Sequence, residues 1–468
     1  MTGKTLLDLG YAPGAWFKSA IAAANRARTE GASDEAVAAL IAAAAPRPPE
    51  RRPLRAHGEL AANLNLRAEG ADEETNLAAV SATMAELMRV PTVRAGAVMP
   101  DACPAGPLGT IPVGGVIAAE NAIHPGMHSA DICCSMAVTI FGDVDATALL
   151  DAGMTRSHFG GGGRAPGARV EPPAALLERF AANRFLKSAV GAASEHFATQ
   201  GDGNHFFYVG RIASTGEVAL VTHHGSRKPG AMLYKAGMAV AEATRKELSP
   251  ETHPANAWIV AESEEGEAYW QALQVVRDWT KANHFAIHDL VAEAIGTRPQ
   301  DRFWNEHNFV FRRSDGLFYH AKGATPAYDG FAADESGLTL IPLNLAEPIL
   351  IARGKDAANG LGFAPHGAGR NMSRTAFLKR HAGRSEAEMI AADAPGIDVR
   401  YFSGVPDVTE LPSAYKNAAT VRAQIDAYGL AEVVDTVEPV GSIMAGDWQR
   451  VAPWVKKRAP RPEGEEGG

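Results

Sequence analysis

A histidine opens the glycine- and arginine-rich run His366-Gly367-Ala368-Gly369-Arg370. Small residues let backbone N–H groups approach an anion, an arginine can hold phosphate oxygens in a fork, and an imidazole can attack phosphorus. The run therefore has the residue types of a phosphate-handling nucleophile, with His366 as the attacking group. Glycine and arginine also build ordinary turns, so the motif on its own is weak.

Further residues that can bind metal are spread over several segments. Asp131 and Cys134 lie three residues apart, just before the apolar run 136–141, which predicts a strand. Each candidate histidine is predicted where a strand meets a turn, a place from which a rigid backbone can aim a side chain into a shared cleft. A single such histidine is more often structural, but several together with an Asp/Cys pair favour one dispersed metal site. The histidines are His205, His223, His224 and His307.

The residue types leave the identity of the metal open. A thiolate with imidazoles suits zinc or iron, whereas a carboxylate and open phosphate positions suit manganese or magnesium. One cysteine sulfur can bridge two ions, and two ions about 4 Å apart would clamp an in-line phosphoryl displacement.

Composition indicates a soluble globular chain. Its 468 residues, 46% hydrophobic and 21% charged, allow one large domain or two to three smaller ones. A net charge of −9 argues against attraction of nucleic acid to the whole surface and leaves a local basic groove open. The three cysteines are too few for a disulfide framework and predict a reducing, cytoplasmic setting. With no basic-then-apolar leader and no apolar run of about 18 residues, we expect neither secretion nor a membrane span.

The order of the predicted elements favours an α+β fold with mixed sheets and flanking helices. Short apolar runs broken by glycine and proline, from about residue 95, predict strands and tight turns. Strands are expected again over 304–353. Helices are predicted over 33–45, 173–199, 231–248 and 264–295.

The domain organisation follows from a change in composition. The Pro/Arg-rich stretch 46–53 reads as a break. We expect a helical N-terminal extension over 1–60, one large domain over 61–454, and a disordered tail over 455–468.

The dispersed segments resemble those of the RtcB family of RNA ligases, the GTP- and manganese-dependent enzymes of tRNA splicing and RNA repair. The runs occur in the family's order over roughly residues 90–446, and the run His-Gly-Ala-Gly-Arg-x-Met-Ser-Arg is the most specific. The matching runs are Met99-Pro100-Asp101, Asp131-Ile132-Cys133-Cys134, Gly203-Asn204-His205-Phe206, His223-His224-Gly225-Ser226-Arg227, His307-Asn308, Lys322-Gly323-Ala324-Thr325, the run from His366 to Arg374, and Ala414-Tyr415-Lys416-Asn417.

The resemblance implies roles for individual residues within an RtcB-like single catalytic domain. His366 would be the nucleophile, and Cys134 would bridge two manganese ions. The remaining metal ligands would be Asp131, His205, His223 and His307. Contacts in the active site would come from Asn204, Arg227 and Arg370. The residues implied to bind the nucleotide are Asn204, His205, Phe206, His307, Asn308, His366, Gly367, Ala368 and Gly369.

The implied reaction has three steps. His366 takes GMP from GTP, the GMP passes to an RNA 3′-phosphate, often made by opening a 2′,3′-cyclic phosphate, and a 5′-hydroxyl then displaces GMP. The implied partners are RNA ends, either tRNA halves or damaged RNA, together with GTP. The sequence leaves the oligomeric state open.

The chain also departs from the family's pattern. Cys103 stands where the family has histidine, and Ser135 follows Cys134 in place of glycine. Tyr208 replaces a glutamate, Ala445 replaces a lysine near the guanylate, and the nucleotide loop reads Pro342-Leu343-Asn344-Leu345-Ala346. Phosphate and metal chemistry are therefore expected to be intact, while recognition of the purine is eroded.

Two alternatives to an RNA ligase follow from these departures. One is a diverged homologue that uses another nucleotide or only processes RNA ends. The other is a non-catalytic protein that binds RNA ends, although survival of His366 with every expected ligand speaks against it. Lys416 or Lys456 could replace the missing lysine.

Several other residues have plainer explanations. His284 and His288, four apart on a predicted helix, lack a metal-binding context, so we expect packing or surface roles. His124 and His128 flank a Pro-Gly turn, where local hydrogen bonding is expected. For contact with RNA we favour Arg374, Lys379 and Arg380 over Arg51, Arg52 and Arg55.

Overall fold

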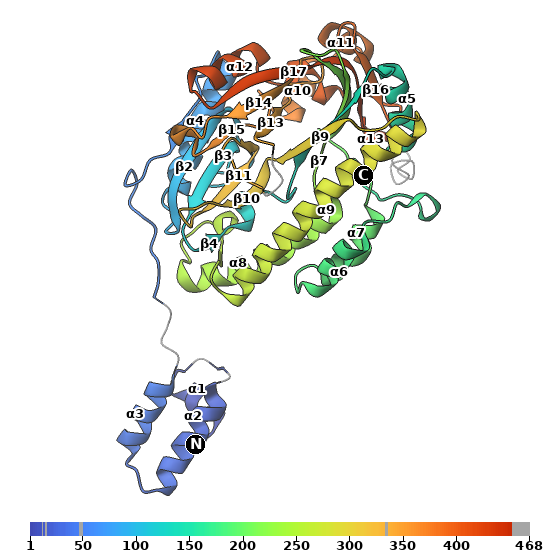
Figure 1. The fold of residues 1–468 in the computed structure, drawn as a ribbon. Helices are drawn as coiled ribbons and strands as arrows, with labels where there is room; N and C mark the ends of the chain where they lie inside the picture. The colour runs from blue at the N-terminus through green and yellow to red at the C-terminus, as the bar shows by residue number, and fades with distance from the viewer. Residues whose placement is uncertain (12, 15, 46–49, 333–335, 452–468) are drawn as a thin grey trace, which may run out of the picture. The chain divides into compact units, whose positions relative to one another are not determined.

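The computed structural model describes residues 1–11, 13–14, 16–45, 50–332 and 336–451, so the expected tail over 455–468 lies outside the described residues. The chain divides into two compact units, Met1–Arg52 and Pro53–Gly468. The larger unit combines helices with mixed sheets, which confirms the α+β class (Figure 1). Among the described residues, no helix has the length and apolar character needed to cross a membrane.

The smaller unit is a set of three helices around a small apolar core. Ser33 accepts a hydrogen bond from the Ala36 N–H and caps the third helix, which confirms the helix predicted over 33–45. The core consists of Leu6, Ala24, Val37 and Ile41. The helices are α1 (Gly3–Asp8), α2 (Trp16–Thr29) and α3 (Asp34–Ala44).

The boundary between the units lies at Arg52, N-terminal to the boundary expected at residue 60. Arg55 explains the difference, because its guanidinium donates to the carbonyls of Val90 at 2.6 Å and Pro91 at 3.0 Å in the larger unit. Residues 53–60 are therefore fixed to the larger unit.

An eight-stranded sheet is the main scaffold of the larger unit. Its strands run in the order β13-β14-β17-β6-β7-β5-β9, with β16 paired to β17. The two edge strands approach each other, since the Leu340 N–H of β13 donates to the Asn305 side chain of β9 at 2.9 Å. Its strands are β5 (Ser135–Gly142), β6 (Phe206–Ile212), β7 (Val218–His224), β9 (Asp301–Glu306), β13 (Leu338–Ile341), β14 (Ile349–Gly354), β16 (Asp398–Tyr401) and β17 (Ala431–Met444).

A second sheet of five strands has the order β1-β2-β3-β11-β10. It is joined to the first sheet through His307, which lies between β9 and β10. A two-stranded ladder of β12 and β15 leads directly to His366. These strands are β1 (Asn63–Leu64), β2 (Val93–Cys103), β3 (Val113–Ala119), β10 (Asn308–Arg312), β11 (Phe318–Lys322), β12 (Ala324–Pro326) and β15 (Phe363–Pro365), and a further pair is β4 (Ala122–Ile123) with β8 (Ile259–Val260).

Helices pack against these sheets, and the longest, α9, crosses the view in Figure 1 beside α8. Its apolar residues recur at spacings of three and four, which is why the sequence predicts it well. The helices are α4 (Ala71–Leu87), α5 (Ala146–Arg156), α6 (Ala174–Ala182), α7 (Val190–Glu195), α8 (Arg227–Leu248), α9 (Glu264–Ala294), α10 (Arg374–Arg380), α11 (Glu386–Asp393), α12 (Ala418–Ala427) and α13 (Trp448–Val451).

The single helix predicted over 173–199 is wrong. The segment forms α6, a 3₁₀ turn over Lys187–Ala189, and α7. Asn183 ends the first piece: its Oδ1 accepts from the Phe185 N–H at 2.9 Å, and its Nδ2 donates to the Ala268 carbonyl at 2.9 Å. An asparagine that bonds the backbone two residues on favours a turn over helix continuation.

The helix predicted over 231–248 starts earlier than expected, at Arg227. Pro229 lies in its first turn, where a proline costs no intrahelical hydrogen bond. Strand β7 continues through both His223 and His224. Because strand side chains alternate between faces, His223 and His224 point to opposite sides of the sheet.

Candidate metal and nucleotide site

Cys134, His223 and His307 bring three metal-ligand atoms together at one end of the eight-stranded sheet. The Cys134 Sγ lies 3.1 Å from the His223 Nε2, which lies 3.1 Å from the His307 Nε2. All three residues are buried, and their ligand atoms lie within 4.8 Å of one another. The backbone supplies this geometry: Cys134 precedes β5, His223 is in the paired strand β7, and His307 follows β9 on the other side of β5.

Asp131 and His205 form a second group with the same cysteine. The His205 Nε2 lies 3.2 Å from the Asp131 Oδ2 and 3.7 Å from the Cys134 Sγ. These three ligand atoms also fall within 4.8 Å of one another. The five residues predicted as metal ligands thus make two adjacent triads that share Cys134.

The hydrogen bonds fix the protonation of His223. Its Nδ1 lies 3.1 Å from the Asn204 carbonyl, an acceptor, so Nδ1 carries the proton and Nε2 carries a lone pair. Burial lowers the pKa of His223 to about 3, and burial also holds the pKa of His307 well below its usual range. Both imidazoles are therefore neutral at physiological pH, the form that binds metal.

The donor set fits a pair of cations. A proton on any one of the three ligand atoms of Cys134, His223 and His307 is shared with one of the others at a time, whereas a cation accepts a lone pair from all three. Burial and the Asp131 charge hold the pKa of the Cys134 thiol well above its usual value, so a cation must displace its proton. The partly buried position of Asp131 raises its pKa, but its hydrogen bond with His205 and the charge of His205 outweigh this and lower it to about 2. An anionic carboxylate thus faces the second triad.

His366 lies beside this pair of triads, directly after β15. Its Nδ1 lies 2.6 Å from the Asp101 Oδ2, and its backbone N–H donates to the same oxygen at 3.2 Å. The Nδ1–H therefore donates to a fully buried carboxylate, which leaves the Nε2 lone pair free to act as a nucleophile. The His366 ring centroid is 4.8 Å from that of His307.

Gly369 allows the nucleophile loop to lie against Asp101. It has φ +75°, and a Cβ there would come within 1.9 Å of the Asp101 carbonyl oxygen. Any other residue would push the loop, and with it His366, away from the carboxylate that orients the ring.

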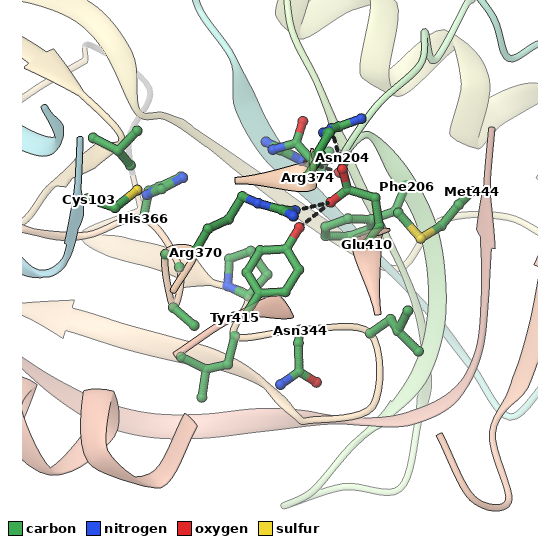
Figure 2. A pocket seen from close by; sticks show the side chains of 18 residues that line it. Cys103, Asn204, Phe206, Asn344, His366, Arg370, Arg374, Glu410, Tyr415 and Met444 are labelled. Carbon is green, nitrogen blue, oxygen red and sulfur yellow. Dashed lines mark hydrogen bonds and ion pairs between the residues drawn. The ribbon is translucent and has the colours of Figure 1, made fainter. Parts of the chain in front are cut away.

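A buried carboxylate organises the arginines next to the nucleophile. Glu410 is in contact with Arg374 and the Tyr415 hydroxyl, and its Oε2 lies 3.4 Å from the Arg370 Nη1 (Figure 2). Burial raises the pKa of Glu410, while the neighbouring Arg374 and Arg370 charges lower it. The Arg370 Nη1 also donates to the Thr409 carbonyl at 2.8 Å, but its Nη2 is buried with no hydrogen-bond partner. That nitrogen is available to an anion.

A cavity of about 290 Å³ opens in front of these groups. Its volume approaches the range usual for small-molecule pockets. Of the predicted residues, it is lined by Asn204, Phe206, His223, His366, Gly367, Ala368, Gly369 and Arg370; the other lining residues are Cys103, Val113, Pro342, Leu343, Asn344, Leu345, Arg374, Glu410, Tyr415 and Met444.

Other predicted site residues lie outside this cavity. His205 and His307 are in the metal triads, and Asn308 supports them, with its Nδ2 donating to the Asp131 carbonyl at 3.3 Å and its Oδ1 accepting from the Gly323 N–H at 2.7 Å. Arg227 donates to the Gly160 carbonyl at 2.7 Å, and its charge interacts with Asp131 and Cys134 of the second triad.

The residues at the departures from the family's pattern divide into two groups. Cys103 and Asn344 line the cavity, whereas Tyr208 and Ala445 are buried away from it. Lys416 does not replace the missing lysine, since its Nζ donates to the Pro100 carbonyl at 2.9 Å and is absent from the cavity lining. The alternative candidate, Lys456, lies outside the described residues.

Sequence reasoning missed three functional neighbours. Asp101 appeared only as part of a matching run, and neither Glu410 nor Tyr415 was assigned a role. The sequence does contain a signal for Asp101: it is a charged residue within an apolar segment, and a buried charge needs a partner. For Glu410 the sequence gives no such signal, because its partners Arg370 and Arg374 are far away in the chain.

Several of the remaining basic and histidine candidates have structural partners. Arg374 contacts Glu410 and Arg380 pairs with Asp72 at 2.8 Å. His124 and His128 are buried, and the local hydrogen bonding expected for them is found, among the described residues, only between His128 and the Ser129 carbonyl. The other partners of their ring nitrogens, Thr92, the Asn256 carbonyl and Tyr269, are distant in the chain. The packing role expected for His284 and His288 is confirmed, because both are fully buried.

Comparison with known proteins identifies the family. Residues 171–445 match the family model described as tRNA-splicing ligase RtcB, which is more than half of the chain. The chain belongs to the RtcB family. Asp101, Asp131 and Cys134 precede the matched segment, so their place beside it rests on the structure.

Curated members of the RtcB family are similar to this chain at modest identity. The tRNA-splicing ligase RtcB of Pyrococcus horikoshii is 27% identical over 282 residues, which are 52% of this chain and 32% of that protein. That of Pyrococcus furiosus is 28% identical over 282 residues, 52% of this chain and 29% of that protein. That of Aeropyrum pernix is 26% identical over 305 residues, 55% of this chain and 61% of that protein. The match spans about a third of the Pyrococcus proteins.

Proposed function

We propose that this protein is an RNA ligase that joins RNA 3′-phosphate or 2′,3′-cyclic phosphate ends to 5′-hydroxyl ends through a guanylylated His366 and two manganese ions. The observation that carries the proposal is the juxtaposition of an imidazole oriented by Asp101 with two metal-ligand triads that share Cys134. The names of the RtcB relatives support it.

The first step needs a nucleophilic nitrogen. With its Nδ1–H held by Asp101 at 2.6 Å, His366 presents Nε2 to the α-phosphorus of GTP. The new N–P bond forms as the bond to pyrophosphate breaks, and GMP remains on the histidine as a phosphoramidate. Asp101 stabilises the imidazolium-like charge that develops on the ring.

In the second and third steps, GMP is transferred to the RNA 3′-phosphate and is then released as the RNA ends are joined. An oxygen of the RNA 3′-phosphate attacks the GMP phosphorus, and the N–P bond breaks, so that His366 recovers its lone pair. The RNA 5′-hydroxyl then attacks the 3′-phosphate, and GMP leaves with the electron pair of the phosphoanhydride bond. A 2′,3′-cyclic phosphate is first hydrolysed to the 3′-phosphate.

Charge on the phosphates must be neutralised. The two ions would supply Lewis-acid stabilisation of phosphoryl oxygens. They would be held by Asp131, Cys134, His205, His223 and His307. The unpartnered Arg370 Nη2 would bind a phosphate oxygen, and backbone N–H groups of the His366 loop would approach the same anion.

An RNA-ligation assay tests the proposal. Purified protein with manganese and GTP is given RNA pairs ending in 3′-phosphate and 5′-hydroxyl, and matched pairs ending in 3′-hydroxyl and 5′-phosphate. We expect joining of the first pair only, lost in His366→Ala and retained in His381→Ala, a histidine on the far end of α10. Joining of the second pair, or joining by His366→Ala, would contradict it.

A further inference from the structure

We propose that the base-binding end of the cavity does not select guanine, and that it accepts guanine, hypoxanthine and adenine nucleotides with comparable efficiency. This inference rests on the proposed function, since it takes the cavity as the nucleotide site. It follows from which polar atoms of the lining are already bonded within the protein.

The walls away from the nucleophile are apolar. In Figure 2, His366 and Cys103 lie at one end of the cavity, and Phe206 and Met444 lie at the other. Leu343 and Leu345 also belong to the lining. Such walls can hold the faces of any base by contact and stacking, and they carry no information about its edge.

Selecting guanine requires an acceptor for its N1–H and amino group. Among the described lining residues, Glu410 is the only carboxylate, and it is 1% exposed. One of its oxygens is in contact with Arg374, and the other with the Tyr415 hydroxyl and the Arg370 Nη1. Both oxygens are committed inside the protein, so Glu410 does not read the base.

The Asn344 amide offers no acceptor at that end either. The Asn344 Oδ1 accepts from the Ala346 and Glu347 N–H groups, each at 3.0 Å, which leaves only Nδ2 as a donor. The Asn204 backbone carbonyl accepts from the His223 Nδ1 at 3.1 Å, which fixes this residue beside the metal ligands. A lone donor serves adenine and guanine alike, because both present ring-nitrogen acceptors.

Tyr208 and Ala445 stand at the two positions where the RtcB resemblance implies charged contacts, and neither residue lines the cavity. The Tyr208 hydroxyl donates to the Val437 carbonyl at 2.9 Å, and the ring packs in the apolar cluster of the eight-stranded sheet. Ala445 is fully buried and offers no polar atom in its side chain. Neither residue reaches a base edge.

The expected size of the effect follows from general specificity limits. A site built to hydrogen-bond a substrate group rejects the analogue without it by about 10⁴–10⁵-fold, whereas an apolar pocket discriminates by about 10²-fold or less. We expect the rates with GTP, ITP and ATP to agree within about tenfold.

The test is covalent labelling of the full-length protein with manganese and equal concentrations of α-phosphate-labelled GTP, ITP or ATP. Binding of GMP and AMP is measured by calorimetry on the same preparation. His366→Ala is the control: it must lose the covalent label while still binding both monophosphates, which separates nucleotide recognition from chemistry.

Similar rates with GTP, ITP and ATP, or similar Kd values for GMP and AMP, support the inference. Labelling by GTP more than about a hundredfold faster than by ATP, or binding of GMP alone, overturns it and leaves the proposed ligase intact. If no nucleotide labels the protein but GMP and AMP bind equally, the inference stands and the covalent mechanism fails. If neither monophosphate binds, both are overturned.

Discussion

At the scale of single residues, Cys134 is the residue shared by the two metal triads, because its sulfur belongs to both. His307 belongs only to the first triad and Asp131 only to the second. Cys133, its neighbour in sequence, is equally buried and belongs to neither. The two adjacent cysteines therefore provide a matched pair for dissecting the site.

We expect Cys134→Ala to lose both manganese ions, and His307→Ala and Asp131→Ala each to lose one. Losing a ligand removes a large share of metal affinity, and a shared ligand affects both ions. Elemental analysis after dialysis against limiting manganese measures the stoichiometry, with Cys133→Ala as the control that keeps both ions. Full metal content in Cys134→Ala would contradict the shared-ligand geometry.

At the scale of elements, strand β7 joins the metal site to a buried polar network. His223 faces the metal ligands, while Thr222 on the opposite face contacts the His284 Nδ1 at 2.6 Å and the His288 Nε2 at 2.8 Å. Ser135, next to Cys134, lies 2.9 Å from the His284 Nε2. Helix α9 thereby contacts strand β7, which carries His223, and the start of strand β5, which follows Cys134.

Thr222→Val should disturb stability and metal binding together. It removes the hydroxyl that serves both histidines of α9, and each buried polar group left without a partner costs about 1–3 kcal/mol. We expect a lower Tm and weaker manganese binding, measured by thermal melting and calorimetry. Thr244→Val in α8, away from the site, is the control; unchanged manganese affinity in a destabilised Thr222→Val would show that α9 does not position the ligands.

Element-scale features were partly predictable from sequence. Helix α9 has clear apolar spacing, and the helix over 33–45 has a capping serine, so local signals were sufficient. The break at Asn183 and the early start of α8 were missed, because the first depends on a contact with Ala268 and the second on tolerance of Pro229 in a first turn. Local pattern does not record such contacts.

The site was predictable as a set of residues, and its geometry was not. Motif residues such as His366 can be recognised along the chain, but their meeting depends on pairing between β5, β7 and β9. The partnership of His366 with Asp101 joins residues 265 positions apart. Likewise, Tyr208 lies outside the cavity because its ring is buried in the apolar cluster of the eight-stranded sheet.

At the scale of the whole molecule, many histidines outside the metal triads are buried and neutral. Burial lowers the pKa of His124 and His128 to about 4, and that of His288 to about 3. In the unfolded chain these groups have pKa values near about 6.5. Between these values the unfolded state binds more protons than the folded state, so acid favours unfolding.

The free energy of unfolding of the metal-free protein should therefore decrease as the pH falls from about 6.5 towards about 4. Urea unfolding at a series of pH values measures the slope. In His128→Gln the slope should be shallower, because the buried histidine whose pKa is lowered by burial is gone. A free energy of unfolding that stays constant across this range would contradict the burial of neutral histidines.

The central claim is that His366, with its Nδ1–H held by Asp101, becomes covalently attached to a nucleotide. The most direct measurement is intact-protein mass spectrometry after incubation with manganese and GTP, followed by mapping of the adduct. The account predicts one acid-labile GMP on His366, strongly reduced in Asp101→Asn, because a neutral amide no longer stabilises the positive charge that develops on the ring. A GMP adduct on another residue, or none in a protein that has bound both manganese and GTP, would contradict it.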